Sequence, residues 1–78
     1  MINIQILGTG CAKCQKLAAN AEIAAKDLDL EYSIEKITDI DRIAEFGIML
    51  TPALAVDGEV KSFGRLLTPE NIRPLLQG

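Results

Sequence analysis

The sequence contains no histidine and no tryptophan, and it has only two cysteines among its 78 residues. Without histidine or a third cysteine, a complete tetrahedral zinc site would need a carboxylate or a second chain. Aromatic residues make up only 4% of the chain, whereas hydrophobic residues make up 49%. This composition predicts a globular protein built on aliphatic packing. Its length predicts a single domain, residues 1–78.

The sequence also lacks the signals of targeting, of a membrane and of a nucleic-acid partner. The apolar run in residues 1–7 has no basic leader and is too short for a signal core or a membrane span. The net charge is −3, and the eight lysines and arginines are scattered, so no basic run could follow a phosphate backbone. We therefore expect a cytoplasmic monomer with neither a nucleic-acid nor a membrane partner.

Strand-like and helix-like patterns alternate along the chain. Apolar residues with a period of two predict strands, and those with a period near 3.6 predict helices. The predicted strands cover residues 2–7, 30–37, 53–56 and 59–63, and the predicted helices run from Cys11 to about residue 28, from a cap at Thr38 or Asp39 to Phe46, and onward from Thr68-Pro69-Glu70. The order is β-α-β-α-β-β-α, in the α/β class. The first strand–helix–strand unit predicts a parallel strand pair.

Finer features of these elements can also be predicted. The strand at residues 30–37 has one polar face, which favours an edge position. Asp57-Gly58 predicts a hairpin between the last two strands. The first helix should bury one stripe of residues, and the second should turn Ile40, Ile43 and Ala44 inward. The stripe of the first helix consists of Cys14, Leu17, Ala18, Ala21, Ala25 and Leu28.

Both cysteines lie where the first strand gives way to the first helix. A helix start carries unpaired N–H groups and a partial positive charge, which favour a thiolate and lower the pKa of a thiol placed there. Cys11 is at the tip, and Cys14 is one turn further, on the face toward the sheet. The spacing brings the sulfurs within bonding reach, so Cys11 could attack a disulfide and Cys14 could resolve the mixed disulfide. Lys13 adds a nearby positive charge.

Three other interpretations of this cysteine pair stay open: two small core residues, a soft-metal carrier, and an interaction module without redox activity. The stretch GTGCAKC superficially resembles the GMxCxxC loop of heavy-metal-associated domains. Those domains have the order β-α-β-β-α-β and end on a strand. The predicted helix between the second and third strands, and the capped helix at the end, argue against that fold.

The chain as a whole resembles the thioredoxin superfamily, in particular its small prokaryotic, glutaredoxin-sized redox-active disulfide proteins. The matching features are Cys11-Ala12-Lys13-Cys14 after the first strand, Thr51-Pro52 before the third, and Gly64 after the fourth. The resemblance implies a thioredoxin-like fold with a four-stranded mixed sheet, in the order 2-1-3-4, and three helices. It implies thiol–disulfide exchange with disulfide-containing protein substrates and a dithiol reductase. No cofactor beyond the redox-active Cys11–Cys14 disulfide is implied.

The same resemblance implies a substrate-binding site beside the cysteines. The Thr51–Pro52 bond should be cis and lie close to the pair, with Thr51 offering its backbone to an extended substrate segment. Gly64 should belong to this substrate-binding site.

Three features depart from the thioredoxin pattern. Gly10 stands where thioredoxins usually carry tryptophan, and Ala12-Lys13 replaces their Gly-Pro. The strand before the motif offers Asn3 and Gln5 in place of a buried acid.

Overall fold

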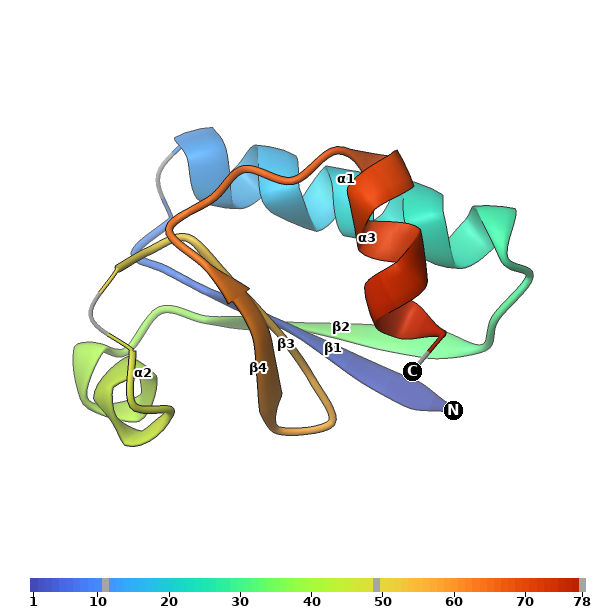
Figure 1. Ribbon diagram of the computed structural model, residues 1–78. Coiled ribbons are helices and arrows are strands. Elements are labelled where there is room, and N and C mark those ends of the chain that lie inside the picture. The colour runs from blue at the N-terminus through green and yellow to red at the C-terminus, as the bar shows by residue number, and fades with distance from the viewer. Residues whose placement is uncertain (11, 49, 78) are drawn as a thin grey trace.

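Four strands form one mixed sheet in the order β2-β1-β3-β4 (Figure 1). The computed structural model describes residues 1–10, 12–48 and 50–77. β1 runs parallel to β2 and antiparallel to β3, and β3 pairs with β4 in an antiparallel hairpin. The fold therefore matches the predicted element order and strand order. The elements are β1 (Ile2–Leu7), α1 (Ala12–Asp27), β2 (Tyr32–Ile37), α2 (Ile40–Glu45), β3 (Ala53–Val56), β4 (Glu59–Phe63) and α3 (Pro69–Leu76).

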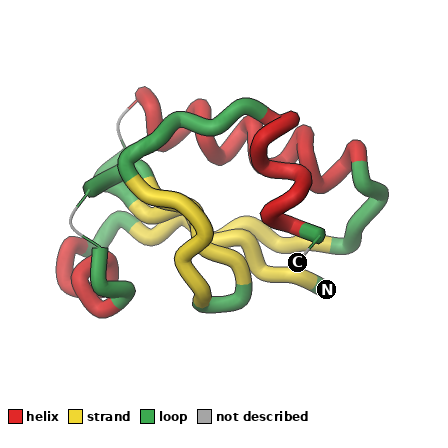
Figure 2. The backbone as a smooth tube through the Cα atoms, in the orientation of Figure 1, coloured by secondary structure: helices red, strands yellow, loops and turns green. Residues whose placement is uncertain are grey.

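The helices cover the two faces of the sheet unequally. α1 and α3 lie together over one face, while α2 sits against one end of the other (Figure 1, Figure 2). The core under α1 and α3 is the larger, and its fully buried members include Ile4, Leu17, Leu54 and Ile72. Burying a side chain of this size contributes about 1.5–3 kcal/mol. The smaller core under α2 consists of Leu7, Ile37, Ile43, Ala53 and Ala55.

The buried stripe of α1 agrees with the sequence prediction. Its buried residues are Cys14, Leu17, Ala18, Ala21, Ala24 and Ala25. Ala24 is an addition to the predicted stripe, and Leu28 is only half-buried, beyond the end of the helix. Small side chains on this stripe let the helix backbone approach the sheet, so the thiol of Cys14 is carried into the core with them.

The second strand begins two residues later than predicted, at Tyr32 instead of Leu30. Asp29 adopts a positive φ of 55°, and the N–H groups of Asp29 and Leu30 donate to the carbonyls of Lys26 and Ala25, at 3.0 and 3.1 Å. This is the Schellman pattern that closes a helix. Leu30 is thus part of the cap of α1. The predicted edge position of β2 is confirmed, since it pairs with β1 alone.

The predicted inward face of α2 is partly wrong. Asp39 caps the helix as expected, its carboxylate accepting from the N–H of Asp41 at 2.9 Å. Ile43 is buried, but Ile40 is 71% exposed and Ala44 is exposed as well. A helix of six residues at the end of a sheet presses only one side chain into the core, so periodicity overstated its buried face.

The Asp57-Gly58 hairpin forms as predicted. Both residues have positive φ, 52° and 86°, as a type I′ turn requires. The turn is also tied to β1: the N–H of Asp57 donates to the Asn3 carbonyl at 2.8 Å, and the N–H of Asn3 donates to the Asp57 carboxylate at 2.9 Å. The N–H of Gly58 donates to the side-chain oxygen of Gln5 at 2.8 Å. The backbone of Asn3 and the side chain of Gln5 therefore hold the hairpin in place.

Candidate redox site

Cys14 lies in the first turn of α1 and is only 5% exposed. Its sulfur packs against Gly8, at the end of β1, so closely that a Cβ atom added to Gly8 would overlap it. Gly8 is itself held to the sheet, because its N–H donates to the carbonyl of Ile37 at 3.0 Å. The absence of a side chain at position 8 thus makes room for the thiol. Cys11, the expected nucleophile, lies outside the described residues.

The loop before β3 reaches the same place. The Cβ of Thr51 is 3.8 Å from the position that a Gly8 Cβ would occupy, so Thr51 and Cys14 flank Gly8. The Thr51–Pro52 bond is cis, as predicted. Thr51 is exposed and Pro52 is buried. The predicted arrangement of the Thr51–Pro52 bond beside the cysteine motif is therefore present at Cys14.

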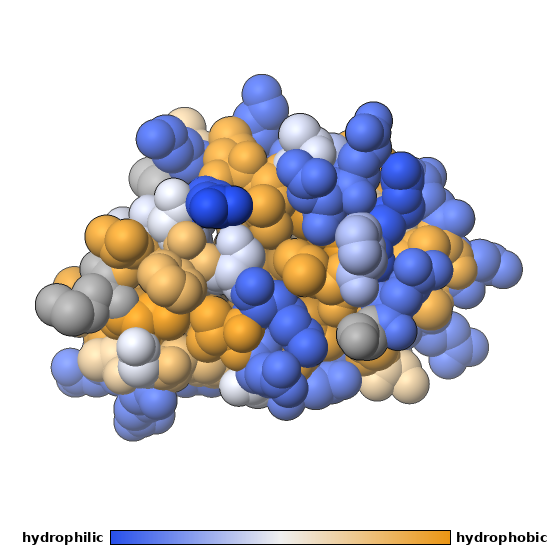
Figure 3. Space-filling view, viewed as in Figure 1, coloured by the Kyte–Doolittle hydropathy of each residue, from blue (hydrophilic) through white to orange (hydrophobic). Residues whose placement is uncertain are grey.

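Gly64 follows the last residue of β4 and contacts the loop that holds Thr51 and Pro52. Its N–H donates to the carbonyl of Pro52 at 2.9 Å. Its φ of +71° favours glycine, and a Cβ there would lie 3.2 Å from the Cβ and Cδ1 of Leu50. The structure thus brings Thr51, Pro52 and Gly64 together. Leu50 is 58% exposed beside them, and Figure 3 shows apolar atoms gathered at this end of the molecule.

Gly10 lies in the turn before α1, and Lys13 lies in the first turn of the helix. Gly10 has a φ of +86°, and its carbonyl accepts from the side-chain amide of Gln15 at 3.2 Å. A tryptophan at position 10 would be strained in this backbone conformation, which explains that departure from the thioredoxin pattern. Lys13 is exposed, so water screens its charge.

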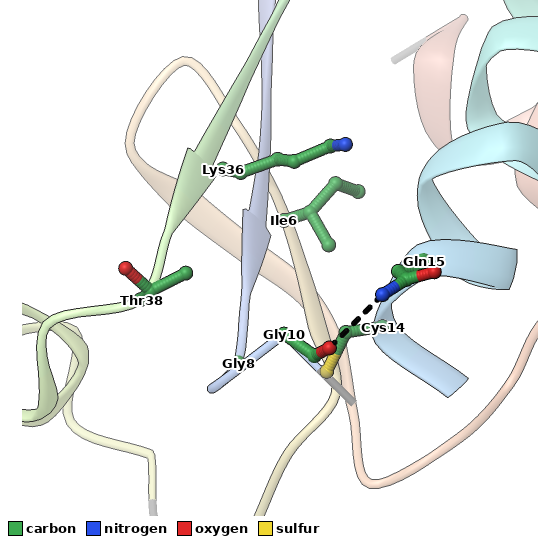
Figure 4. Close-up of a pocket in the computed structure, with 7 residues that line it drawn as sticks. All are labelled: Ile6, Gly8, Gly10, Cys14, Gln15, Lys36 and Thr38. Atoms are coloured by element: carbon green, nitrogen blue, oxygen red, sulfur yellow. Dashed lines mark hydrogen bonds between the residues drawn. The ribbon is translucent and has the colours of Figure 1, made fainter. Parts of the chain in front are cut away.

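A small cavity of about 30 Å³ opens beside Cys14 (Figure 4). Sequence reasoning did not predict that Lys36, near the end of β2, would line it. The signal was available, since alternation in β2 puts Lys36 on the same side as Tyr32 and Ile34. The residues that line the cavity are Ile6, Gly8, Gly10, Cys14, Gln15, Lys36 and Thr38. None of them is acidic.

Asn3 and Gln5, the polar residues of β1, do not line this cavity. Gln5 is 8% exposed and, besides accepting from Gly58, donates to the Glu35 carboxylate at 3.4 Å. Glu35 also accepts from Arg42 at 3.1 Å. The hydrogen bond from Arg42, followed by those from Asn3 and Gln5, holds the pKa of Glu35 below its ordinary value of 4.5. The polar residues of β1 therefore serve the opposite face of the sheet.

Across residues 1–10, 12–48 and 50–77, no three Cys, Asp or Glu side chains are grouped so that they could hold a metal ion. Within the same residues, no helix has the length and apolar character needed to cross a membrane.

A cysteine buried at a strand–helix junction, a cis proline beside it and a sheet ordered 2-1-3-4 define a protein of the thioredoxin class. A sequence model of the thioredoxin domain family matches residues 2–77, and the chain belongs to this family. It is 49% identical over 76 residues to a thioredoxin of Methanothermobacter thermautotrophicus, covering 97% of this chain and 99% of the relative. It is 35% identical over 77 residues to a thioredoxin of Methanocaldococcus jannaschii, covering 99% and 88%. Its enzyme class is that of the thiol–disulfide oxidoreductases.

Proposed function

We propose that the protein exchanges electrons with protein disulfides through Cys11 and Cys14, without another cofactor. Cys11 is the attacking thiol, and Cys14 is the resolving one. The observation that carries this order is the 5% exposure of Cys14 beneath Gly8. A protein disulfide in solution has no access to a sulfur in that position, so the first attack falls to the other thiol of the motif.

The reaction has two exchange steps. The Cys11 thiolate attacks one sulfur of the substrate disulfide, a mixed disulfide forms, and the other substrate sulfur leaves as a thiolate. Cys14 then loses its proton and attacks the Cys11 sulfur. The Cys11–Cys14 disulfide closes, and the second substrate thiolate leaves. The substrate gains two electrons, which a dithiol reductase later returns to the protein by the reverse exchange.

The substrate segment lies against the loop before β3. Thr51, exposed next to the buried Pro52, offers its backbone to an extended chain. Gly64 supports that loop through its hydrogen bond to Pro52, and the exposed Leu50 adds apolar surface. The protein acts as a monomer in the cytoplasm, where small-molecule thiols keep such dithiols reduced.

The test is to trap the mixed disulfide in two single variants, Cys11→Ser and Cys14→Ser. Each reduced variant is mixed with a disulfide-bonded protein and analysed by mass spectrometry without reductant. Cys14→Ser should accumulate a covalent adduct at Cys11, because the resolving thiol is gone. Cys11→Ser should form none. An adduct on Cys11→Ser alone would reverse the order.

A soft-metal carrier predicts a different result from the same proteins. Loss of either thiolate would weaken metal binding to a similar extent, and metal transport requires no covalent adduct. Titration of the reduced protein with a soft metal ion, followed by thiolate-to-metal absorbance, reports this directly. An interaction module without redox activity would show no reversible reduction of the Cys11–Cys14 pair. If the unaltered protein reduces no protein disulfide and neither variant forms an adduct, the proposed function is wrong.

A further inference from the structure

The end of β4 and the residues that follow it form a basic groove at the edge of the sheet. The groove has a volume of about 280 Å³ and is lined by Lys61, Ser62, Phe63 and Arg65. None of these four residues is acidic. Because β4 is an edge strand that pairs with β3 alone, its outer side is accessible to a second protein.

The two cations of the groove differ in how much of their charge is available. The ammonium group of Lys61 donates to the Glu59 carboxylate at 3.1 Å, so part of its charge is neutralised. Arg65 is exposed, and the three ion pairs in the part of the chain that the structure describes do not involve it. The guanidinium group of Arg65 is therefore the charge that an incoming anion meets.

This groove is continuous with the loop against which we place the substrate. Gly64 stands between Phe63 and Arg65, and its N–H donates to the carbonyl of Pro52 at 2.9 Å. The chain that leaves β4 thus passes beside the loop before β3 (Figure 1, Figure 2). Paired strands lie about 4.8 Å apart and an extended residue spans about 3.3 Å, so a peptide held at Thr51 reaches the groove within about two or three residues.

The chemistry of the groove selects an acidic segment of a partner protein. A guanidinium group binds a carboxylate through two parallel hydrogen bonds, and a lysine of the partner would be repelled by Arg65. Phe63, which is 54% exposed, adds apolar contact area beside this charge. The chain as a whole has a net charge of −3, which does not favour acidic partners in general. A basic groove next to the redox site therefore favours a carboxylate at one particular place in the substrate.

We propose that Arg65 is a specificity-determining residue, which favours protein disulfides that carry an acidic side chain close to the attacked cysteine. The inference rests on the proposed function, because it concerns which disulfides Cys11 attacks. The exchange step itself is unchanged: the Cys11 thiolate bonds to one substrate sulfur, the substrate disulfide breaks, and the departing thiolate takes the electron pair of the broken bond.

The test uses synthetic peptides that differ at a single position. Each peptide has one cysteine, joined by a disulfide to an aromatic thiol whose thiolate is coloured and leaves readily. The position two residues before the cysteine is glutamate, glutamine or lysine, and a second set varies the position two residues after it. The protein is the Cys14→Ser variant, so that only the attack by Cys11 is observed. The second-order rate constant is read from the release of the coloured thiolate.

The quantity compared is the ratio of the rate constants for the glutamate and glutamine peptides, which a general change in the reactivity of Cys11 leaves unaltered. In one of the two sets this ratio should be about three, the effect of one exposed ion pair. It should decrease in concentrated salt, which screens exposed charges.

Three further substitutions, each added to Cys14→Ser, assign the preference to Arg65. Arg65→Met should bring the ratio to about one, since the charge is gone. Arg65→Glu should make the lysine peptide the fastest of its set. Lys26→Met, in the last turn of α1, changes the net charge by the same amount as Arg65→Met and should keep the original ratio.

Three results would overturn the proposal: equal rates for the glutamate and glutamine peptides in both sets, a preference that survives Arg65→Met, or an equal loss of preference in Lys26→Met. Equal slowing of all peptides in Arg65→Met, with the ratio unchanged, is the second of these results. A failure of the proposed function looks different, because it does not depend on the peptide. In that case Cys11→Ser would release the coloured thiolate from every peptide as fast as Cys14→Ser does.

Discussion

One face of the sheet is covered along its length by α1 and α3, whereas the other carries α2 at one end only (Figure 1, Figure 2). Aliphatic side chains fill the covered face. Beyond α2, the second face carries Asn3, Gln5, Ser33 and Glu35, which are joined by hydrogen bonds. The first face is held by packing along its length, and the second by the small core under α2 together with these polar contacts. Cys14 lies where the packed face ends, so the core that stabilises the fold also buries the thiol to which we assign the resolving step.

The largest expected difference between the faces is in their response to cavity-forming substitutions. Replacing Leu17, a fully buried residue of α1, with alanine should lower the free energy of unfolding by about 3–5 kcal/mol. Ile43→Ala, on the other face, should cost about 2 kcal/mol, because its neighbours on α2 are exposed and can close over the space. Urea unfolding of the reduced variants measures both. Equal losses would mean that the two faces stabilise the fold alike.

Gly8→Ala tests the contact at the boundary of the packed face. The new Cβ meets the Cys14 sulfur, so the helix start must shift, at a cost of about 1–3 kcal/mol. Closure of the Cys11–Cys14 disulfide should also slow, measured as the second release of coloured thiolate when the reduced protein is mixed with an aromatic disulfide. Gly47→Ala is the control, because its φ of +77° imposes a backbone cost of about 1–2 kcal/mol while its Cβ would meet nothing within 4 Å. Equal rates of disulfide closure in the two variants would show that the contact between Gly8 and the Cys14 sulfur does not affect the exchange.

The smallest effect is expected on the polar face, where Glu35 and Arg42 are both largely exposed. Because the pKa of Glu35 lies below its ordinary value of 4.5 in the folded protein, its stabilisation is present above about pH 4.5 and is lost as the pH falls through the lowered value. Glu35→Gln should therefore be less stable than the unaltered protein at neutral pH, and the difference should shrink in acid.

Arg42→Met sharpens this test, since the hydrogen bond from Arg42 is the largest cause of the lowered pKa. In the Arg42→Met protein, the further substitution Glu35→Gln should produce a smaller pH-dependent difference in the free energy of unfolding. Urea unfolding between about pH 3 and neutral pH reports each variant. A difference that stays constant over this range would show that the charge of Glu35 does not matter to stability.

Local signals in the sequence predicted most of the fold. The pair Asp57-Gly58 predicted the hairpin correctly, because few residue pairs tolerate the two positive φ angles that its turn requires. The alternating isoleucines of β1 and the alanine stripe of α1 marked the packed face. The prediction erred where tertiary context decides: alternation extended β2 into Leu30, which caps α1, and helical periodicity overstated the buried face of α2.

The sequence predicted the motif residues of the candidate site, but it did not predict which residues pack around Cys14. The cysteine spacing, Thr51-Pro52 and Gly64 could be recognised from residue types and their order. The contact of Gly8 with Cys14, and the position of Lys36 at its cavity, depend on how α1 docks over two strands. Gln5 lies on the strand where thioredoxins carry a buried acid, but strand alternation turns it to the other face, where it binds Gly58 and Glu35.

The central claim, that Cys14 is the sheltered thiol and Cys11 the attacking one, is tested most directly by alkylation of the reduced protein. A bulky maleimide is added at neutral pH, and initial rates are read by mass spectrometry after trypsin digestion. Cleavage after Lys13 puts the two cysteines on separate peptides. We expect Cys11 to react at least about tenfold faster, since exposure and thiolate character both favour it. Equal rates, or faster modification of Cys14, would contradict the account.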